Sequence, residues 1–523
     1  MIIIKNIPSL REIIDNKENL TCLTSNNGDT SKLNIYLKDV ANNIARLEND
    51  KSFWYEKFYS ILSDFTFMLD EITYVSSVIP CGLIIPYFGF VYDMQNENKI
   101  LTRINSVAYR GAKISVNMDN VDMNPIEFIN HLVKLLWHQS FNLGMYCLNM
   151  SVGHKNTLDF ITAKQNVDYI KNFIFCIHIS DEFMDSIINK TSIENIQMFD
   201  KLAEAIHDVG EPTIAFSDRI NEANTIPQNG RLQTISSCGE MALFDNEGFV
   251  EGSINLSKMI DNGTINYNKL SDVTRTAVRL LDDVIETSYY ENSRIEEATK
   301  ATRKIGIGVT GFADMLIQLN ISYNSKKALS TAENIMQFIN NEAHKASEEL
   351  AKERGAFPLY ASNKLLPNPI RNATVTAVSH AGFLPIATKC CMGIEPLFST
   401  RTTRFTKNRI GKKDKLTYEY PHKQKNKNVI KTAYSISPKW HIKMQAAFQK
   451  HIDGGVSKTI NLPKRATVEN VKNMILLAYQ LRCKGIAIYR KGCNCEPTTV
   501  FREEGENDKK IDYDWTINGN DLL

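Results

Sequence analysis

The sequence lacks an excess of charge of either sign, because 61 lysines and arginines oppose 59 aspartates and glutamates over 523 residues, a net charge of +2. Such a balance does not indicate a chain that binds nucleic acid or an anionic membrane surface. The N-terminal stretch "MIIIKNIPSLREII" also lacks a long apolar run, since Lys5 and Pro8 interrupt it. We therefore expect neither a signal peptide nor a transmembrane helix, and neither nucleic acid nor membrane as a partner.

The chain also lacks the dense cysteine pattern of a secreted disulfide scaffold, because its ten cysteines are scattered. Scattered thiols indicate a reducing compartment, so we expect a cytoplasmic protein. Cys483, Cys493 and Cys495 follow one another with a spacing that no common zinc site uses. We therefore predict no metal site.

Two cofactor signatures are incomplete. The stretch "GIGVTG" at 306–311 has the glycine pattern of a dinucleotide site, but helix-like polar residues precede it and no acidic residue ends a following strand. We interpret its glycines as points of close backbone packing. In "AIHDVG", His207 stands where cobalt-binding modules carry their histidine, but Ala205 replaces the required aspartate. We interpret His207 as a histidine at a helix end.

The sequence does contain an alternation of helical and strand-like segments. Helices are predicted at 34–72, 273–290 and 468–483, the last with Gly485 as its C-terminal cap. Short apolar strands are predicted at "TIAFSD", "GSINL", "IGIGVTG", "NATVTAV" and "IAIYR". This alternation predicts an α/β protein. The basic segment 401–431 is predicted to be a solvated loop, with a phosphate-binding flap as the alternative.

The stretch "TISSCGE" at 234–240 places a thiol beside a carboxylate, and it has two interpretations. Cys238 is a small core residue next to a surface acid, or it is a reacting thiol with Glu240 in reach as a general base. The local sequence alone favours the first interpretation.

A long series of motifs then follows one order along the chain. "GEPTIAFSDRINEAN" is followed by "CGE", "GSINLS", "TRKIGIGVTGFADML", "RNATVTAV" and "GIEPLFS", and the last blocks are "WHIKMQAAFQKHIDGGVSKTINLP" and "AYQLRCKGIAIYRKG". In these blocks, from about residue 150 to 500, the chain resembles the catalytic subunit of ribonucleotide reductase, closest to the adenosylcobalamin-dependent class II branch. Residues 1–149 match poorly, apart from "YRGAKIS" at 109–115.

The resemblance implies a fold and a division of the chain. We expect an α/β fold in which a ten-stranded α/β barrel at 76–500 surrounds a central finger loop. A helical N-terminal region at 1–75 and a polar tail at 501–523 complete the expected organisation.

The resemblance also implies a reaction. A thiyl radical on Cys238 would abstract the 3′-hydrogen of a ribonucleotide-type substrate, and Glu240 would remove the 3′-hydroxyl proton. Radical delivery from a second subunit uses paired tyrosines, whereas "IAIYRKG" offers the single Tyr489, which favours adenosylcobalamin as cofactor. The expected partners are a nucleotide-like small molecule and a thiol reductant, and the expected assembly is a homodimer.

Three features depart from the family pattern. Ser236 stands where an asparagine binds a substrate hydroxyl, and Phe249 stands where one cysteine of the redox pair is expected. Cys81, in "PCGLIIP", is the one plausible remnant of the partner cysteine. The family's phosphate-binding turn is replaced by "SHAGF". The substrate-binding residues expected there are Ser379, His380, Ala381, Gly382 and Phe383.

These departures leave three hypotheses open. The first is an adenosylcobalamin-dependent reductase acting on a nucleotide. The second is a diverged radical enzyme of specialised metabolism that gives a non-reductive product. The third is an inactive paralogue that binds nucleotides, which retention of Cys238 and Glu240 disfavours.

Overall fold

The computed structural model describes most of the chain. The described residues are 31–79, 82–137, 146–166, 173–362, 367–379, 388, 390–398, 401–407, 413–419, 428–493, 500–502, 515 and 517.

One half of the barrel is a set of five parallel strands. They lie side by side in the order of the chain, and a helical connection returns the chain before each next strand. Most of their residues are buried, as is usual for strands covered on both faces. The strands are β2 (Tyr87–Val91), β3 (Lys113–Asn117), β4 (Tyr146–Ser151), β5 (Phe173–Ile179) and β6 (Thr213–Phe216).

The other half runs in the opposite direction and closes the ring. It contains β9 (Gly248–Asn255), β12 (Ile305–Thr310), the segment 374–378, β15 (Thr459–Leu462) and β16 (Gly485–Arg490). β9 pairs antiparallel with β2, and β16 pairs antiparallel with β6. Parallel bridges join Ile307 to Thr376 and Val378 to Val456, which links β12 through 374–378 to the start of the β15 segment. The expected ten-stranded α/β barrel is therefore confirmed.

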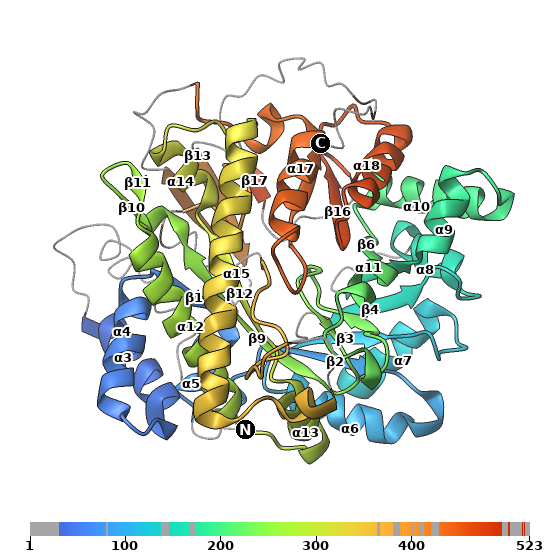
Figure 1. Cartoon of the computed structure of the whole chain (residues 1–523). Helices are drawn as coiled ribbons and strands as arrows, with labels where there is room; N and C mark the ends of the chain where they lie inside the picture. Colours follow the sequence, from blue (N-terminus) through green and yellow to red (C-terminus); the bar gives the residue numbers. More distant parts are fainter. Residues whose placement is uncertain are drawn as a thin grey trace.

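Helices surround the strands (Figure 1), and the long α15 runs down the outer side of the barrel beside α12. Among the described helices, none is both long and apolar enough to cross a lipid bilayer. The helices that follow the N-terminal region are α6 (Glu97–Ala108), α7 (Pro125–Trp137), α8 (Thr157–Asn166), α9 (Asp181–Ile188), α10 (Ile193–Val209), α11 (Ser217–Glu222), α12 (Tyr267–Thr287), α13 (Ser293–Thr302), α14 (Phe312–Gln318), α15 (Lys326–Arg354), α17 (Pro438–Gln449) and α18 (Val468–Gln480).

Residues 34–72 are mainly helical, as predicted, but they do not form one continuous helix. The region divides into α3 (Ser31–Ile44), α4 (Lys51–Ser63), β1 (Phe67–Leu69) and α5 (Glu71–Ser77). The Asp50 carboxylate accepts a hydrogen bond from Phe53 N at 3.1 Å and so starts a new helix. Phe65, at φ +51°, turns the chain into β1, which pairs antiparallel with β9. Local capping thus interrupts a continuous apolar pattern.

Two interpretations of glycines have different outcomes. Gly306 and Gly308 lie in β12, where an added Cβ would lie 2.9 Å from Ala377 Cβ and 2.6 Å from Ala377 O respectively, so the close-packing interpretation is confirmed. Gly485 is not a helix cap, because Leu481 ends α18 and Gly485 begins β16. An added Cβ there would meet Ile214 O at 2.6 Å, so the antiparallel seam with β6 requires the glycine.

The basic segment predicted as a solvated loop contains two strands. β13 (Arg401–Lys407) and β14 (Lys413–Glu419) form an antiparallel hairpin, and β17 (Val500–Arg502) pairs with β13. Because β17 lies almost a hundred residues further along the chain, its pairing cannot be read from the basic composition alone. Two short pairs complete the described strands: β7 (Thr234–Ile235) with β8 (Ala242–Leu243), and β10 (Ile260–Asp261) with β11 (Thr264–Ile265).

Candidate active site

The stretch "TISSCGE" forms a finger loop inside the barrel. β7 and β8 pair antiparallel, with Thr234 opposite Leu243, and residues 236–241 form the tip. The tip closes on itself: Ser236 N donates to Met241 O at 2.9 Å, Gly239 N donates to Ser236 O at 2.9 Å, and Met241 N donates to Ser236 Oγ at 2.9 Å. The expected central finger loop is therefore present.

Both halves of the barrel hold this loop in place. From the first half, Asn149 Oδ1 accepts from Ile235 N at 3.1 Å, and Ser115 Oγ donates to Ile235 O. From the second half, Gly455 N donates to Glu240 O at 2.7 Å. An added Cβ at Gly455 would lie 2.0 Å from Gly239 O, so only glycine permits this approach. The loop is thus clamped along both sides.

Cys238 lies at the tip of the loop and Glu240 lies beneath it. Glu240 is fully buried, and its Oε2 accepts from Cys238 N at 3.0 Å. Cys238 is half-buried, and the adjoining Gly239 is exposed. Burial, followed by the negative charge of Glu240, raises the pKa of the Cys238 thiol to about 12. The thiol therefore keeps its hydrogen near neutral pH, as a donor of hydrogen atoms must.

The other expected binding residues have varied positions. Ser236 is buried and its hydroxyl accepts from Met241 N, so the structure shows it holding the tip, and contact with a substrate stays a prediction. Ser379 is buried and follows the 374–378 strand at its carboxyl end. Outside the described residues lie Cys81, His380, Ala381, Gly382 and Phe383.

Phe249, at the position expected for a redox cysteine, is fully buried on β9. Its cross-strand partner in register is Tyr87 of β2, and the two rings stack with centroids 4.8 Å apart at an interplanar angle of 27°. The residue facing Phe249 is therefore Tyr87, which sequence reasoning missed. The short aromatic, strand-like stretch "YFGF" at 87–90 is the signal that could have found it.

A charged cluster beside the loop was also missed. Lys113 Nζ donates to Tyr87 Oη at 2.6 Å and to Asp70 Oδ2 at 2.6 Å. Glu251 lies two residues after Phe249 on β9, and hence on the same inner face of the barrel. Both Tyr87 and Glu251 are almost fully buried. The signal available in the sequence was that Tyr87, Lys113 and Glu251 are polar residues within otherwise apolar strands. The sequence does not show that these strands, β2, β3 and β9, lie together.

These buried groups change one another's ionisation. Burial, followed by the charge of Glu240, raises the pKa of Glu251 well above its ordinary value. Burial also raises the pKa of Glu240, although Lys113, Ser236 and Tyr87 oppose it. Burial acts to lower the pKa of Lys113, but Asp70 and the two glutamates together raise it above its ordinary value. Glu240 and Glu251 therefore hold a proton more firmly than they would in water.

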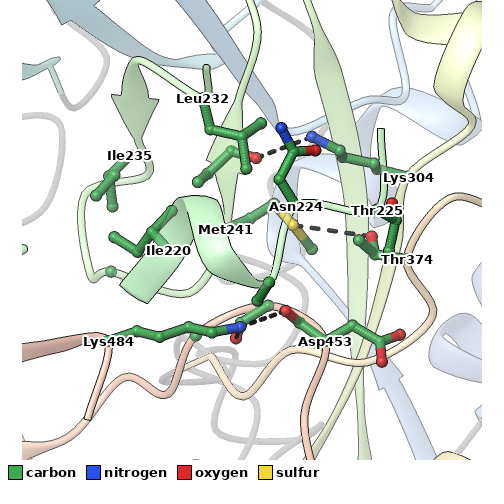
Figure 2. A pocket seen from close by; sticks show the side chains of 15 residues that line it. Ile220, Asn224, Thr225, Leu232, Ile235, Met241, Lys304, Thr374, Asp453 and Lys484 are labelled. Carbon is green, nitrogen blue, oxygen red and sulfur yellow. Dashed lines mark hydrogen bonds between the residues drawn. The ribbon is translucent and has the colours of Figure 1, made fainter. Parts of the chain in front are cut away.

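A pocket lies along the finger loop (Figure 2). It is lined by Gly239, Met241 and Ala242 of the loop and by lysines from the barrel wall. Figure 2 shows Lys484 beside Asp453, where its Nζ donates to Gly454 O at 2.8 Å, and Lys304 Nζ donates to Ala242 O at 3.0 Å. Because both ammonium groups bind backbone carbonyls, we interpret this pocket as part of the loop's support.

The described residues show two further features: the surroundings of His207, and how the side chains that could bind a metal ion are grouped. His207 is in the last turn of α10, with Nε2 2.9 Å from Ala466 O and Nδ1 3.0 Å from Asp208 Oδ1, so its interpretation as a helix-end histidine is confirmed. In the described part of the chain, no three His, Cys, Asp or Glu side chains are grouped to hold a metal ion.

Comparison with known proteins gives one consistent relationship. The model of the ribonucleotide reductase barrel domain matches residues 185–368 and 361–489. The chain is 35% identical over 385 residues to the vitamin B12-dependent ribonucleoside-diphosphate reductase of Mycobacterium tuberculosis, covering 66% of this chain and 56% of that protein. It is 33% identical over 393 residues to the protein of the same name from Thermoplasma acidophilum, covering 67% of this chain and 51% of that protein.

A solved structure shows the same fold. The class Id ribonucleotide reductase alpha subunit of Actinobacillus ureae superposes with a TM-score of 0.74 at 17% identity, over 93% of this chain and 99% of that one. The chain spans about half the length of the curated relatives it matches. The match of a single family model to more than half of the chain, together with the closed barrel and its finger loop, shows that this chain belongs to the ribonucleotide reductase family.

Proposed function

We propose that the protein is a thiyl-radical enzyme that abstracts a hydrogen atom from the ribose of a nucleotide-type substrate. The observation that carries this proposal is the Cys238–Glu240 pair at the centre of the barrel, a protonated thiol whose backbone N–H binds a fully buried carboxyl group. An inactive paralogue would have no need for this arrangement in a clamped loop. The relatives named vitamin B12-dependent reductases support the same assignment.

The proposed cofactor is adenosylcobalamin. When bound, it supplies a carbon-centred radical by homolysis of its cobalt–carbon bond. The described residues fit such a group in their chemistry, because the half-buried Cys238 offers an S–H bond at the loop tip. His207 is bonded to Ala466 O and so does not serve as a ligand of cobalt.

The chain's own residues then have defined tasks. Cys238 gives up its hydrogen atom and, as a thiyl, takes a hydrogen atom from the substrate's 3′-carbon. Glu240 accepts the proton of the 3′-hydroxyl, for which Oε1 is available, since no described group donates a hydrogen bond to it. The barrel wall excludes water from this step, which protects the radical from quenching. The segment after Ser379 is the proposed site for the substrate phosphate.

The test is electron paramagnetic resonance of the full chain with adenosylcobalamin and a panel of ribonucleotides. We expect a signal of the cleaved cofactor in the wild type and none in Cys238→Ala. The matched control is Cys483→Ala, because Cys483 is another buried thiol whose pKa burial raises to about 12. A signal that is equal in Cys238→Ala and wild type, or absent from wild type with every nucleotide, contradicts the proposal.

A further inference from the structure

A second buried carboxyl group lies beside the Cys238–Glu240 pair, and the steps proposed above do not use it. Glu251 shares the inner face of β9 with Phe249, against which Tyr87 stacks. Tyr87 in turn accepts from Lys113 Nζ at 2.6 Å. Four elements thus converge here: the finger loop, β2, β3 and β9.

Each of the two carboxyl groups has one buried oxygen atom that could bind a hydroxyl group of the substrate. Glu240 and Glu251 are 0% and 3% exposed, and Oε1 of Glu240 and Oε2 of Glu251 accept no hydrogen bond from any described residue. Buried carboxyl oxygens are rarely left without a donor. An orphan oxygen on each group, both inside the barrel, is what a substrate with two neighbouring hydroxyls would require.

The charge balance requires that this cluster retain a proton. Asp70, Glu240 and Glu251 face one cation from the described residues, Lys113, which Asp70 already binds. Two ionised glutamates without a second cation would carry a large cost in this buried position. The Tyr87 phenol interacts with both glutamates and lowers the pKa of each, although burial outweighs it. One glutamate can therefore act as a base while the other carries a proton.

We propose that Glu251 is a second catalytic residue, a general acid that protonates the hydroxyl lost from the substrate, so that the net reaction is a dehydration without a reductant. This inference rests on the proposed function, because it requires the thiyl on Cys238. It also accounts for the Tyr87–Phe249 pair. Phe249 stands at one position of the expected thiol pair and stacks on Tyr87, so this position supplies no electrons, and the neighbouring groups supply only protons.

The atoms and electrons balance in four steps. The Cys238 thiyl takes a hydrogen atom from a carbon that carries a hydroxyl, so a C–H bond breaks and an S–H bond forms. The Glu240 carboxylate accepts the proton of that hydroxyl. Protonated Glu251 gives its proton to the neighbouring hydroxyl, which leaves as water with the C–O bonding pair. The resulting radical next to a carbonyl takes the hydrogen atom back from Cys238, which restores the thiyl.

A vicinal diol thus becomes a deoxyketone and water, and no external electrons are used. The proton that Glu240 gained must return to Glu251 before the next turnover. The proposed route for that return is the Tyr87 hydroxyl, which Lys113 binds on the ring that stacks against Phe249. The substrate class is a ribose-type vicinal diol, such as the 2′,3′-diol of a ribonucleotide.

The test uses the full chain with adenosylcobalamin and 3′-deuterated ribonucleotides. Products are trapped with borohydride and analysed by mass spectrometry, and free thiols are counted before and after. We expect a trapped deoxyketone with no loss of thiols. In Glu251→Gln we expect water loss to fall about 10²- to 10⁴-fold, the usual contribution of a general acid, while deuterium loss from the 3′-carbon continues.

The matched control is Asp283→Asn on α12, outside the barrel. Asp283 is also buried, and burial, followed by its hydrogen bond with Glu48, raises its pKa to about 8. This variant should retain wild-type product formation. A second readout needs no cofactor: the infrared carbonyl band of protonated carboxyl groups should weaken in Glu251→Gln relative to the wild type, and an unchanged band would contradict a protonated Glu251.

The outcomes separate this inference from the proposed function. A deoxynucleotide formed with matching thiol oxidation overturns the dehydration and leaves the thiyl-radical function in place. Unchanged water loss in Glu251→Gln also overturns the role of Glu251 alone. Absence of both deuterium loss and the cofactor signal in the wild type, with every substrate, contradicts the proposed function itself.

Discussion

Gly455→Ala should damage catalysis by displacing the finger loop without altering any reacting group. The added Cβ would lie 2.0 Å from Gly239 O, whereas real Cβ contacts are essentially never shorter than 3.0 Å, so the two segments must separate by at least 1.0 Å. The hydrogen bond from Gly455 N to Glu240 O, now 2.7 Å long, would then be stretched or lost. Cys238 and Glu240 directly flank Gly239, so the displacement reaches the reacting groups directly.

The expected magnitudes follow from this displacement. Overpacking of a well-packed site typically costs about 1–3 kcal/mol of unfolding free energy. A misplacement of about 1 Å at a reacting group can cost roughly 10²-fold in rate. We therefore expect the rate of 3′-deuterium loss from substrate to fall about 10²-fold in Gly455→Ala, with a modest decrease in the denaturant midpoint.

The control for this prediction is Gly153→Ala. An added Cβ at Gly153 meets no atom within 4 Å, and its φ is not positive, so the same chemical change should have almost no effect. Deuterium loss and urea unfolding should be measured for both variants. Wild-type rate and stability in Gly455→Ala would refute the argument that the barrel wall positions the thiol through this contact.

Three further predictions concern the buried charges and rings. Lys113→Met leaves Asp70 without its cation, so we expect the unfolding free energy, measured by urea titration, to fall by about 3–5 kcal/mol. A decrease below about 1 kcal/mol would contradict the argument that Lys113 and Asp70 form a buried ion pair. Burial raises the pKa of Asp314 from 3.8 to about 6, so the stability that its protonated form contributes is complete below pH 3.8 and is lost as pH rises through 6. Asp314→Asn should remove up to about 3 kcal/mol of this pH dependence of the unfolding free energy between pH 4 and 7, and an unchanged pH profile would refute the argument. The double variant Tyr87→Cys, Phe249→Cys should form a disulfide on oxidation, because directly paired antiparallel residues have Cα atoms about 4.5–5.5 Å apart. Two results would contradict this pairing: thiol counting that finds no disulfide in the double variant, or dithiol-driven reduction of substrate by Phe249→Cys alone.

Sequence reasoning reached the fold and the reacting pair for different reasons. The ordered motifs predicted the barrel, and the structure confirms it through the seams of β9 with β2 and of β16 with β6. Cys238 and Glu240 were predicted because they lie two residues apart in one loop. The helical character of 34–72 was predicted but its division was not, because the Asp50 cap and the positive φ of Phe65 are single-residue features within an otherwise helical pattern.

The sequence by itself determined the alternating elements, the glycines of close approach and the thiol with its adjacent acid, because each of these depends on residues that are neighbours in the chain. The tertiary structure alone decided that Tyr87 faces Phe249, that Lys113 joins Tyr87 to Asp70 and that Glu251 lies in the same buried cluster as Glu240. These residues come from strands up to about 180 positions apart, and closure of the barrel brings them together. Their shared burial, which no local pattern encodes, is the physical reason that the pKa values of two ordinary glutamates rise.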